Sequence, residues 1–173
     1  MQNTNIFPNR ILLAIDDSEA AALAAEKAVD LANGTGSELH LVHVGQLPIF
    51  LMKKIDTIGF DRILYEQIER EALEALWKLT WLVKAAGGPV AGAHLRMGVV
   101  AEEIVGLAKD LEVDLIVMGG RGHGGLRRAI EGSISDHVVR HAHCPVMTVR
   151  TETGEEHRGF WRRIFSSRSD SFG

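Results

Sequence analysis

Glycine is concentrated in one stretch of the chain, from Val117 to Ser133, which reads V-M-G-G-R-G-H-G-G-L-R-R-A-I-E-G-S. An apolar segment of strand character precedes the stretch, and a helical pattern that begins at Ser133 follows it. Glycines let backbone N–H groups approach a polyphosphate without Cβ atoms in the way, and a helix N-terminus attracts anions. The stretch therefore predicts a phosphate-binding loop.

Two familiar phosphate motifs do not account for this loop. A Walker A motif needs a lysine, and no lysine follows Lys109. The glycines 120, 122 and 125 fit G-x-G-x-x-G. That dinucleotide fingerprint belongs in the first strand-to-helix turn and needs an acidic residue at the end of the next strand. Here the loop lies late in the chain, and the next strand ends in Arg150. We therefore reject the dinucleotide interpretation.

A third spacing fits better: Gly119, two residues, Gly122, nine residues, then Gly132 and Ser133. It resembles the nucleotide-binding signature of the universal stress protein family. The resemblance extends in order over about residues 9–150. Its other matching segments are I-L-L-A-I-D at 11–16, L-V-H-V at 41–44, G-V-V-A-E-E-I at 98–104 and R-H-A-H-C-P-V at 140–146.

The resemblance implies a site for ATP, with Mg²⁺, or for AMP or another adenine nucleotide. In the family, the acid at the end of the first strand holds the adenosine part of ATP, a role that passes to Asp16. Asp17 departs from the family, because many members carry glycine there, and it adds negative charge near the nucleotide. The implied cofactor-binding residues are Ala14, Ile15, Asp16, Val44, Met118, Gly119, Gly122, Gly132, Ser133 and Ile134.

Composition predicts one small domain. The chain has 173 residues, 46% of them apolar, which is enough for a core of its own. A net charge of −4 gives no overall nucleic-acid footprint. We find no apolar run of about 20 residues and no secretory signal pattern. The single Cys144 excludes an internal disulfide, so we expect a cytoplasmic protein.

Apolar segments of strand and helix character alternate along the chain. Such alternation predicts an α/β fold: a single doubly wound domain with a five-stranded parallel sheet and helices on both faces. Among the allowed topologies we choose the strand order 3-2-1-4-5. Asp16 and Gly119 would end the two strands between which the order reverses, where ligands bind in such sheets. The predicted strands are 10–16, 38–44, 90–96, 113–119 and 146–150, and the predicted helices are 18–33, 61–86, 101–111 and 133–141.

Several side chains have a structural interpretation beside the functional one. Asp16 caps the first helix or contacts the ligand. His137 and His141, four residues apart on a helix, favour a helix end over a zinc site, because no second cysteine accompanies them. The apolar segment 49–60 is a lid, a dimer contact or a core helix. We assign no catalytic and no metal-ligating residue.

Two segments predict partners. The strand Val146–Val149 is an apolar edge, through which members of the family often form homodimers. Residues 1–150 form the predicted nucleotide-binding domain, and residues 151–173 form a basic aromatic tail. Within 158–167, apolar side chains alternate with arginines at helical spacing. We expect this segment to fold back on its own domain or dimer. The alternatives, in order, are an unknown protein partner and weak contact with an anionic membrane.

Three functions are compatible with these patterns. The first is an ATP-binding regulatory protein that senses or signals stress through nucleotide occupancy and through dimer or partner contacts. The second is a slow ATPase or phosphotransferase, for which Asp17, His123 and Arg127 form no recognisable constellation. The third is a dimeric scaffold that binds no nucleotide. We favour binding over catalysis.

Overall fold

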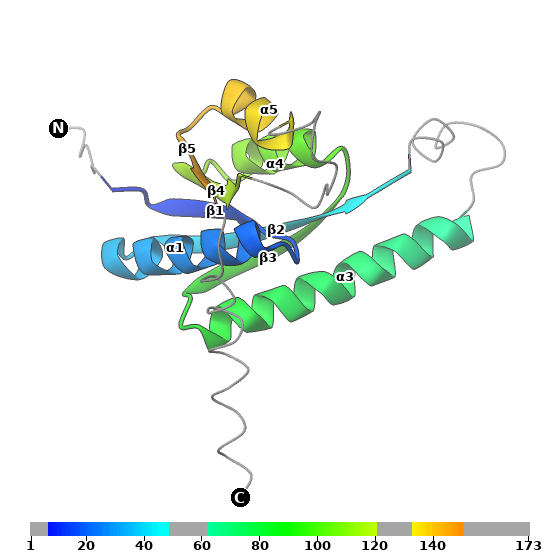
Figure 1. The fold of residues 1–173 in the computed structure, drawn as a ribbon, viewed down its shortest axis with the longest axis horizontal. Coiled ribbons are helices and arrows are strands. Elements are labelled where there is room, and N and C mark those ends of the chain that lie inside the picture. The colour runs from blue at the N-terminus through cyan, green and yellow to red at the C-terminus, as the bar shows by residue number, and fades with distance from the viewer. Residues whose placement is uncertain (1–6, 49–61, 121–132, 151–173) are drawn as a thin grey trace, which may run out of the picture.

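Five parallel strands form a single sheet in the order β3-β2-β1-β4-β5 (Figure 1). In the computed structural model, the described residues are 7–48, 62–120 and 133–150. The predicted fold class and strand order are confirmed. The strands are β1 (Arg10–Ala14), β2 (Glu38–Gln46), β3 (Val90–Gly98), β4 (Leu115–Gly119) and β5 (Val146–Val149).

Helices cover both faces of the sheet, as predicted. On one face, α1 (Glu19–Thr35) and α3 (Arg62–Ala85) pack over one apolar cluster, to which β1 contributes Ile11, Leu13 and the adjoining Ile15. On the other face, α4 (Val100–Asp110) and α5 (Ser133–His141) cover a second cluster that includes Leu12 and Ala14. Consecutive residues of β1 thus alternate between two buried faces, which explains its uninterrupted apolar sequence.

The start of α1 was predicted correctly and its end was not. Ser18 is the N-cap, and its Oγ accepts a hydrogen bond of 3.1 Å from the N–H of Ala21. The predicted stop was Gly34, but the helix continues to Thr35 and ends at Gly36. Gly36 has a φ of 72°, a left-handed conformation that glycine adopts without strain. Two nearby glycines were candidates, and only the backbone conformation distinguishes them.

Strand lengths also differ from the predictions. β2 and β3 each extend two residues further, because they continue to pair as far as Gln46 and Gly98. β4 begins later than predicted. The N–H of Val113 bonds to the carbonyl of Ala108 and closes α4, and the Asp114 carboxylate accepts bonds from the backbone at the start of β1. These two residues serve the turn before the strand.

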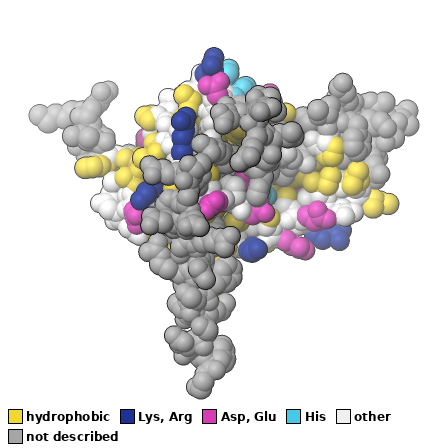
Figure 2. All heavy atoms as spheres, in the orientation of Figure 1, with side chains coloured by type: hydrophobic (Ala, Val, Ile, Leu, Met, Phe, Trp, Pro, Cys, Tyr) yellow, Lys and Arg dark blue, Asp and Glu magenta, His cyan; other side chains and the backbone are white. Residues whose placement is uncertain are grey.

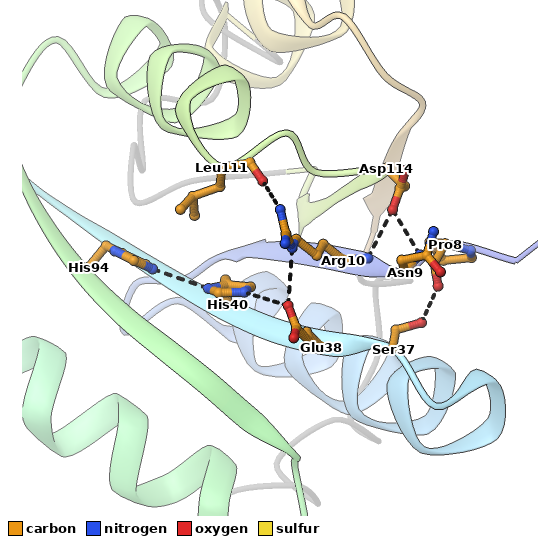
Figure 3. Close-up of polar contacts among 9 residues, drawn as sticks. All are labelled: Pro8, Asn9, Arg10, Ser37, Glu38, His40, His94, Leu111 and Asp114. Atoms are coloured by element: carbon orange, nitrogen blue, oxygen red, sulfur yellow. Dashed lines mark hydrogen bonds and ion pairs between the residues drawn. The ribbon is translucent and has the colours of Figure 1, made fainter.

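Polar contacts join the chain segments at the amino edge of the sheet (Figure 3). Oδ2 of Asp114 accepts the N–H groups of Asn9 and Arg10 at 2.8 and 2.9 Å. The Arg10 guanidinium donates to Glu38 at 3.1 Å and to the carbonyl of Leu111 at 2.9 Å. The start of β1 is therefore fixed to both of its neighbours in the sheet.

Candidate functional site

The predicted site lies at the carboxyl ends of β1 and β4, which are adjacent in the sheet. Ala14 is in register with Met118, and the strand order reverses between these two strands. Asp16 follows β1, and Gly119 ends β4. The fold therefore brings the first-strand acid and the start of the glycine-rich stretch to one edge, where ligands bind in open α/β sheets.

Asp16 is half-buried at the turn that leads into α1. Its Oδ1 accepts a hydrogen bond of 2.9 Å from the N–H of Ser18. Its second oxygen has no hydrogen-bond partner among the described residues. Ser18, not Asp16, supplies the helix cap. The turn thus orients the carboxylate through one of its two oxygens.

Four predicted site residues from four different elements meet in one apolar cluster. Ala14 of β1 and Met118 of β4 are buried in it, and Val44 of β2 and Ile134 of α5 pack against it half-buried. Their side chains offer apolar surface on the α4–α5 face of the sheet. A planar, apolar group of a ligand would find its contact there.

Ile15 lies differently from these four residues. Its side chain is 3% exposed and belongs to the cluster beneath α1, on the opposite face. Its backbone is fixed by β2: its N–H bonds to the carbonyl of Val42, and Nδ1 of His43 donates to its carbonyl, both at 2.9 Å. Ile15 can therefore serve a ligand only through its backbone.

His43, which had no predicted role, supports the backbone next to the site. Its bond to the Ile15 carbonyl holds the chain immediately before Asp16. The available signal was a polar side chain within the apolar run L-V-H-V, on a strand that pairs with β1.

Gly119 is packed against the first turn of α1. A Cβ placed on it would lie 2.9 Å from the backbone carbon of Ala20 and 2.9 Å from the backbone nitrogen of Ala21. The next N–H, that of Gly120, bonds to the carbonyl of Val149 at 2.7 Å. Gly119 thus has a packing role whether or not it contacts a ligand.

Of the residues predicted to bind phosphate, the structure describes Ser133 but not the two glycines. Ser133 begins α5, as predicted. Gly122 and Gly132 lie outside the described residues, as do His123 and Arg127. Asp17 is exposed beside Asp16.

The paired histidines of α5 stack on each other. The ring centroids of His137 and His141 are 4.1 Å apart, and Nδ1 of His141 donates to the carbonyl of His137 at 2.8 Å. Within the described ranges, no three His, Cys, Asp or Glu side chains gather in a way that could hold a metal ion. None of the helices in these ranges has the length and apolarity needed to cross a bilayer.

Whereas the predicted site lies at the carboxyl ends of the strands, a second polar region lies at their amino ends. A shallow depression of about 610 Å³ lies there, and its lining includes Arg10, Glu38 and Asp114. These three groups are engaged in the bonds that fix β1. The Arg10 guanidinium, hydrogen-bonded to Glu38, holds the pKa of the Glu38 carboxyl below the ordinary value, and the His40 ring 3.6 Å away lowers it further. We interpret this region as structural.

A histidine pair adjoins that region between β2 and β3 (Figure 3). Nδ1 of His40 lies 3.3 Å from Nε2 of His94. A Cβ on Gly92 would come within 2.8 Å and 2.9 Å of these two nitrogens, so glycine makes room for the pair. Burial lowers the pKa of His94, and electrostatic repulsion from His40 and Arg96 lowers it further. Arg96 itself bonds to Asp110 of α4 at 2.7 Å.

The depressed pKa of His94 predicts a loss of stability in acid. Below the ordinary value of 6.5 the unfolded chain binds the proton first, so the free energy of unfolding falls as pH drops towards the folded pKa. His94→Asn should reduce the loss measured by urea unfolding between about pH 7.5 and pH 5. His143→Asn, at an exposed histidine outside the pair, is the control. Equal pH dependence in both variants would contradict the prediction.

Comparison with known proteins places this geometry in a family. The model of the universal stress protein family matches residues 8–150, which include every described element. The chain belongs to the universal stress protein family. Relatives are similar over nearly their whole length. Universal stress protein YxiE of Bacillus subtilis is 36% identical over 149 residues, which cover 82% of this chain and 99% of that protein.

Two further relatives agree. A universal stress protein of Methanocaldococcus jannaschii is 32% identical over 152 residues, covering 87% of this chain and 86% of that protein. The solved structure of universal stress protein UspA from Lactobacillus plantarum is similar, with a TM-score of 0.70 and 28% identity. It covers 84% of this chain and all of that one. The tail after residue 150 lies outside the family match.

Proposed function

We propose that this universal stress protein is an ATP-binding regulatory protein that senses or signals stress through nucleotide occupancy. The observation that carries the proposal is Asp16. Its carboxylate stands where the strand order reverses, one oxygen is fixed by the N–H of Ser18, and the other has no hydrogen-bond partner among the described residues. A ribose hydroxyl is a suitable donor for that second oxygen.

The residues around Asp16 suit the parts of an adenine nucleotide. Adenine would lie against the apolar cluster formed by Ala14, Val44, Met118 and Ile134. The backbone at Ile15 and Gly119 would approach the base or the ribose. Gly122, Gly132 and Ser133 would donate backbone N–H groups to the phosphates. Mg²⁺, when bound, would neutralise phosphate charge beside Asp16 and Asp17, with phosphate and carboxylate oxygens as its preferred ligands.

Adenine nucleotides are known in proteins of the same fold. One universal stress protein was solved in complex with cAMP, and one from Archaeoglobus fulgidus with dAMP. Their identities to this chain are 20% and 22%, which establishes a shared fold. The proposed ligand for this chain therefore rests on its own residues. We propose binding with at most weak ATP hydrolysis, since the spacing of Asp17, His123 and Arg127 forms no recognisable catalytic constellation.

The test begins with protein purified without added nucleotide. Denaturation and mass spectrometry identify any released small molecule, and calorimetry then measures ATP binding with Mg²⁺. We expect about one adenine nucleotide per chain. Asp16→Ala should weaken binding by about 10- to 100-fold, the effect of losing a hydrogen bond to a charged group. Asp30→Ala, at an exposed carboxylate of α1, should leave it unchanged. No nucleotide in either assay would reject the proposal and favour the scaffold.

A homodimer through β5 is the second part of the proposal. β5 is an edge strand, bonded within the described sheet to β4 alone, and its Met147 is 39% exposed. An apolar edge of this kind needs a cover, and a second copy across a two-fold axis supplies one. Light scattering at micromolar concentration should give the mass of two chains. The mass of one chain would remove the dimer without affecting the nucleotide proposal.

The proposed setting is the reducing cytoplasm. Cys144, the single cysteine, is half-buried beneath α4 and α5. Burial raises the pKa of its thiol, and the nearby Asp114 charge raises it further. The thiol therefore stays protonated near neutral pH and reacts slowly.

A further inference from the structure

α3 carries an apolar stripe on its outward surface in addition to its core-facing side. Leu73, Trp77 and Trp81 follow one another at intervals of four residues, so they share one face of the helix. Their side chains are 41%, 66% and 42% exposed. At the right-hand end of α3, where the helix begins and ahead of this stripe, Figure 2 shows hydrophobic side chains beside acidic and basic ones. The core-facing side of the same helix consists of Ala72, Leu76, Leu79, Thr80, Leu82 and Val83.

Acidic side chains border the stripe. Glu69 precedes Leu73 by four residues and Glu74 precedes Trp77 by three, so both lie beside the stripe. From Arg62 to Lys78 the helix carries four glutamates, two arginines and one lysine, a net charge of −1, and Arg62 is paired with Glu66. This surface therefore favours an occupant that is both apolar and basic.

One segment of the chain has that chemistry. Residues 158–167 contain three arginines and no acidic residue, a net charge of +3, which is opposite in sign to the charge of α3 between Arg62 and Lys78. They lie beyond the family match, which ends at residue 150. Their four large apolar side chains, at helical spacing, are Phe160, Trp161, Ile164 and Phe165. We propose that segment 158–167 docks on the stripe formed by Leu73, Trp77 and Trp81 of its own chain.

The connection is long enough for this contact. β5 ends at Val149, at the carboxyl edge of the sheet. A Cβ on Gly45, near the same edge of β2, would lie 2.9 Å from Cβ of Ala72, so the stripe begins at that level. From β5 to β2 is three strand spacings, about 15 Å, and the helix layer adds about 12 Å. The ten Cα-to-Cα steps from Arg150 to Phe160 span up to about 33 Å.

Docking within one chain is favoured over docking between chains. A tethered segment has an effective concentration in the millimolar range, so modest contacts suffice to hold it. Docking removes apolar surface of both segment 158–167 and the α3 stripe from water, which is favourable. The inference goes beyond the proposed function and does not depend on nucleotide binding.

Limited trypsin digestion of the full chain tests the contact, because arginines 158, 162 and 163 are cleavage sites within the segment. The variant Leu73→Ser with Trp77→Ser should be cut there about tenfold faster, through a shifted opening equilibrium. Val139→Ser removes a residue of α5 that is 53% exposed, on the other face of the sheet, and should be cut at the unmodified rate. Equal rates in all three proteins would overturn the proposal. Protection that disappears on dilution would also overturn it, in favour of a second copy.

Tryptophan fluorescence provides a second readout that does not depend on cleavage. The chain has three tryptophans, and all of them belong to the proposed contact. With Trp81→Phe and Trp161→Phe, Trp77 becomes the single reporter. Ending this chain at Arg150 should increase acrylamide quenching of Trp77 while light scattering gives an unchanged number of chains. Unchanged quenching would mean that the segment does not cover the stripe.

Discussion

A chain that carries Gly122→Ala and Gly132→Val is expected to lose bound adenine nucleotide almost completely. Both glycines belong to the spacing that begins at Gly119 and ends at Ser133. Each new Cβ would keep backbone N–H groups from the phosphates, and losing two charge-assisted hydrogen bonds corresponds to roughly 100-fold or more in affinity. Mass spectrometry of the purified variant, followed by calorimetry with ATP and Mg²⁺, measures the loss.

Gly125→Val is the matched control for this loss. Gly125 belongs to the dinucleotide spacing G-x-G-x-x-G and not to the universal stress protein signature. The proposed site therefore predicts that Gly125→Val keeps its nucleotide. Loss of nucleotide in the control, together with retention in the double variant, would reverse the assignment of the loop. Thermal unfolding should remain cooperative in both proteins.

Gly119→Ala is expected to destabilise the folded chain by about 1–3 kcal/mol. Its new Cβ would meet the backbone of Ala20 and Ala21 at 2.9 Å, and a backbone neighbour cannot rotate away as a side chain can. To relieve the overlap, α1 must shift away from β4. A loss of this size lowers Tm by about 3–10 °C in a domain of this length, as calorimetry or circular dichroism would measure.

Gly106→Ala is the control that shows how stability changes when a glycine without close neighbours is replaced by alanine. Gly106 lies inside α4, and a Cβ placed on it would meet nothing within 4 Å. Alanine there should stabilise the protein by about 0.5–1 kcal/mol, because it restricts the unfolded chain and favours the helix. If both variants shift Tm in the same direction, the close approach of β4 to α1 is not what constrains residue 119.

The fold followed from the sequence because each strand and helix has a clear local pattern. The apolar run I-L-L-A-I at residues 11–15 predicted a strand, and β1 has apolar clusters on both of its faces. The end of α1 did not follow, since Gly34 and Gly36 have the same chemical character. Only the chain beyond the helix determines which of them takes the left-handed conformation.

The site could be predicted from the sequence less completely than the fold. Alternation along β1 places Ala14 and Ile15 on opposite faces, so the different environment of Ile15 was within reach of sequence reasoning. The sequence did not reveal whether Asp16 or Ser18 caps the helix. Both residue types cap helices, and the choice depends on the turn that each adopts. The support that His43 gives to the Ile15 carbonyl required knowledge of which strands are neighbours.

The two edges of the sheet differ in the connections that they carry. At the amino edge the helices return to the strands through short segments, such as Gly36 and Ser37 between α1 and β2, and hydrogen bonds join them. At the carboxyl edge the chain runs through residues 47–61 between β2 and α3 and through residues 120–132 between β4 and α5. Insertions at the carboxyl edge leave the core and the bonded edge intact. Sequence changes confined to residues 47–61 and 120–132 can therefore accumulate while the hydrogen-bonded framework of the sheet is kept.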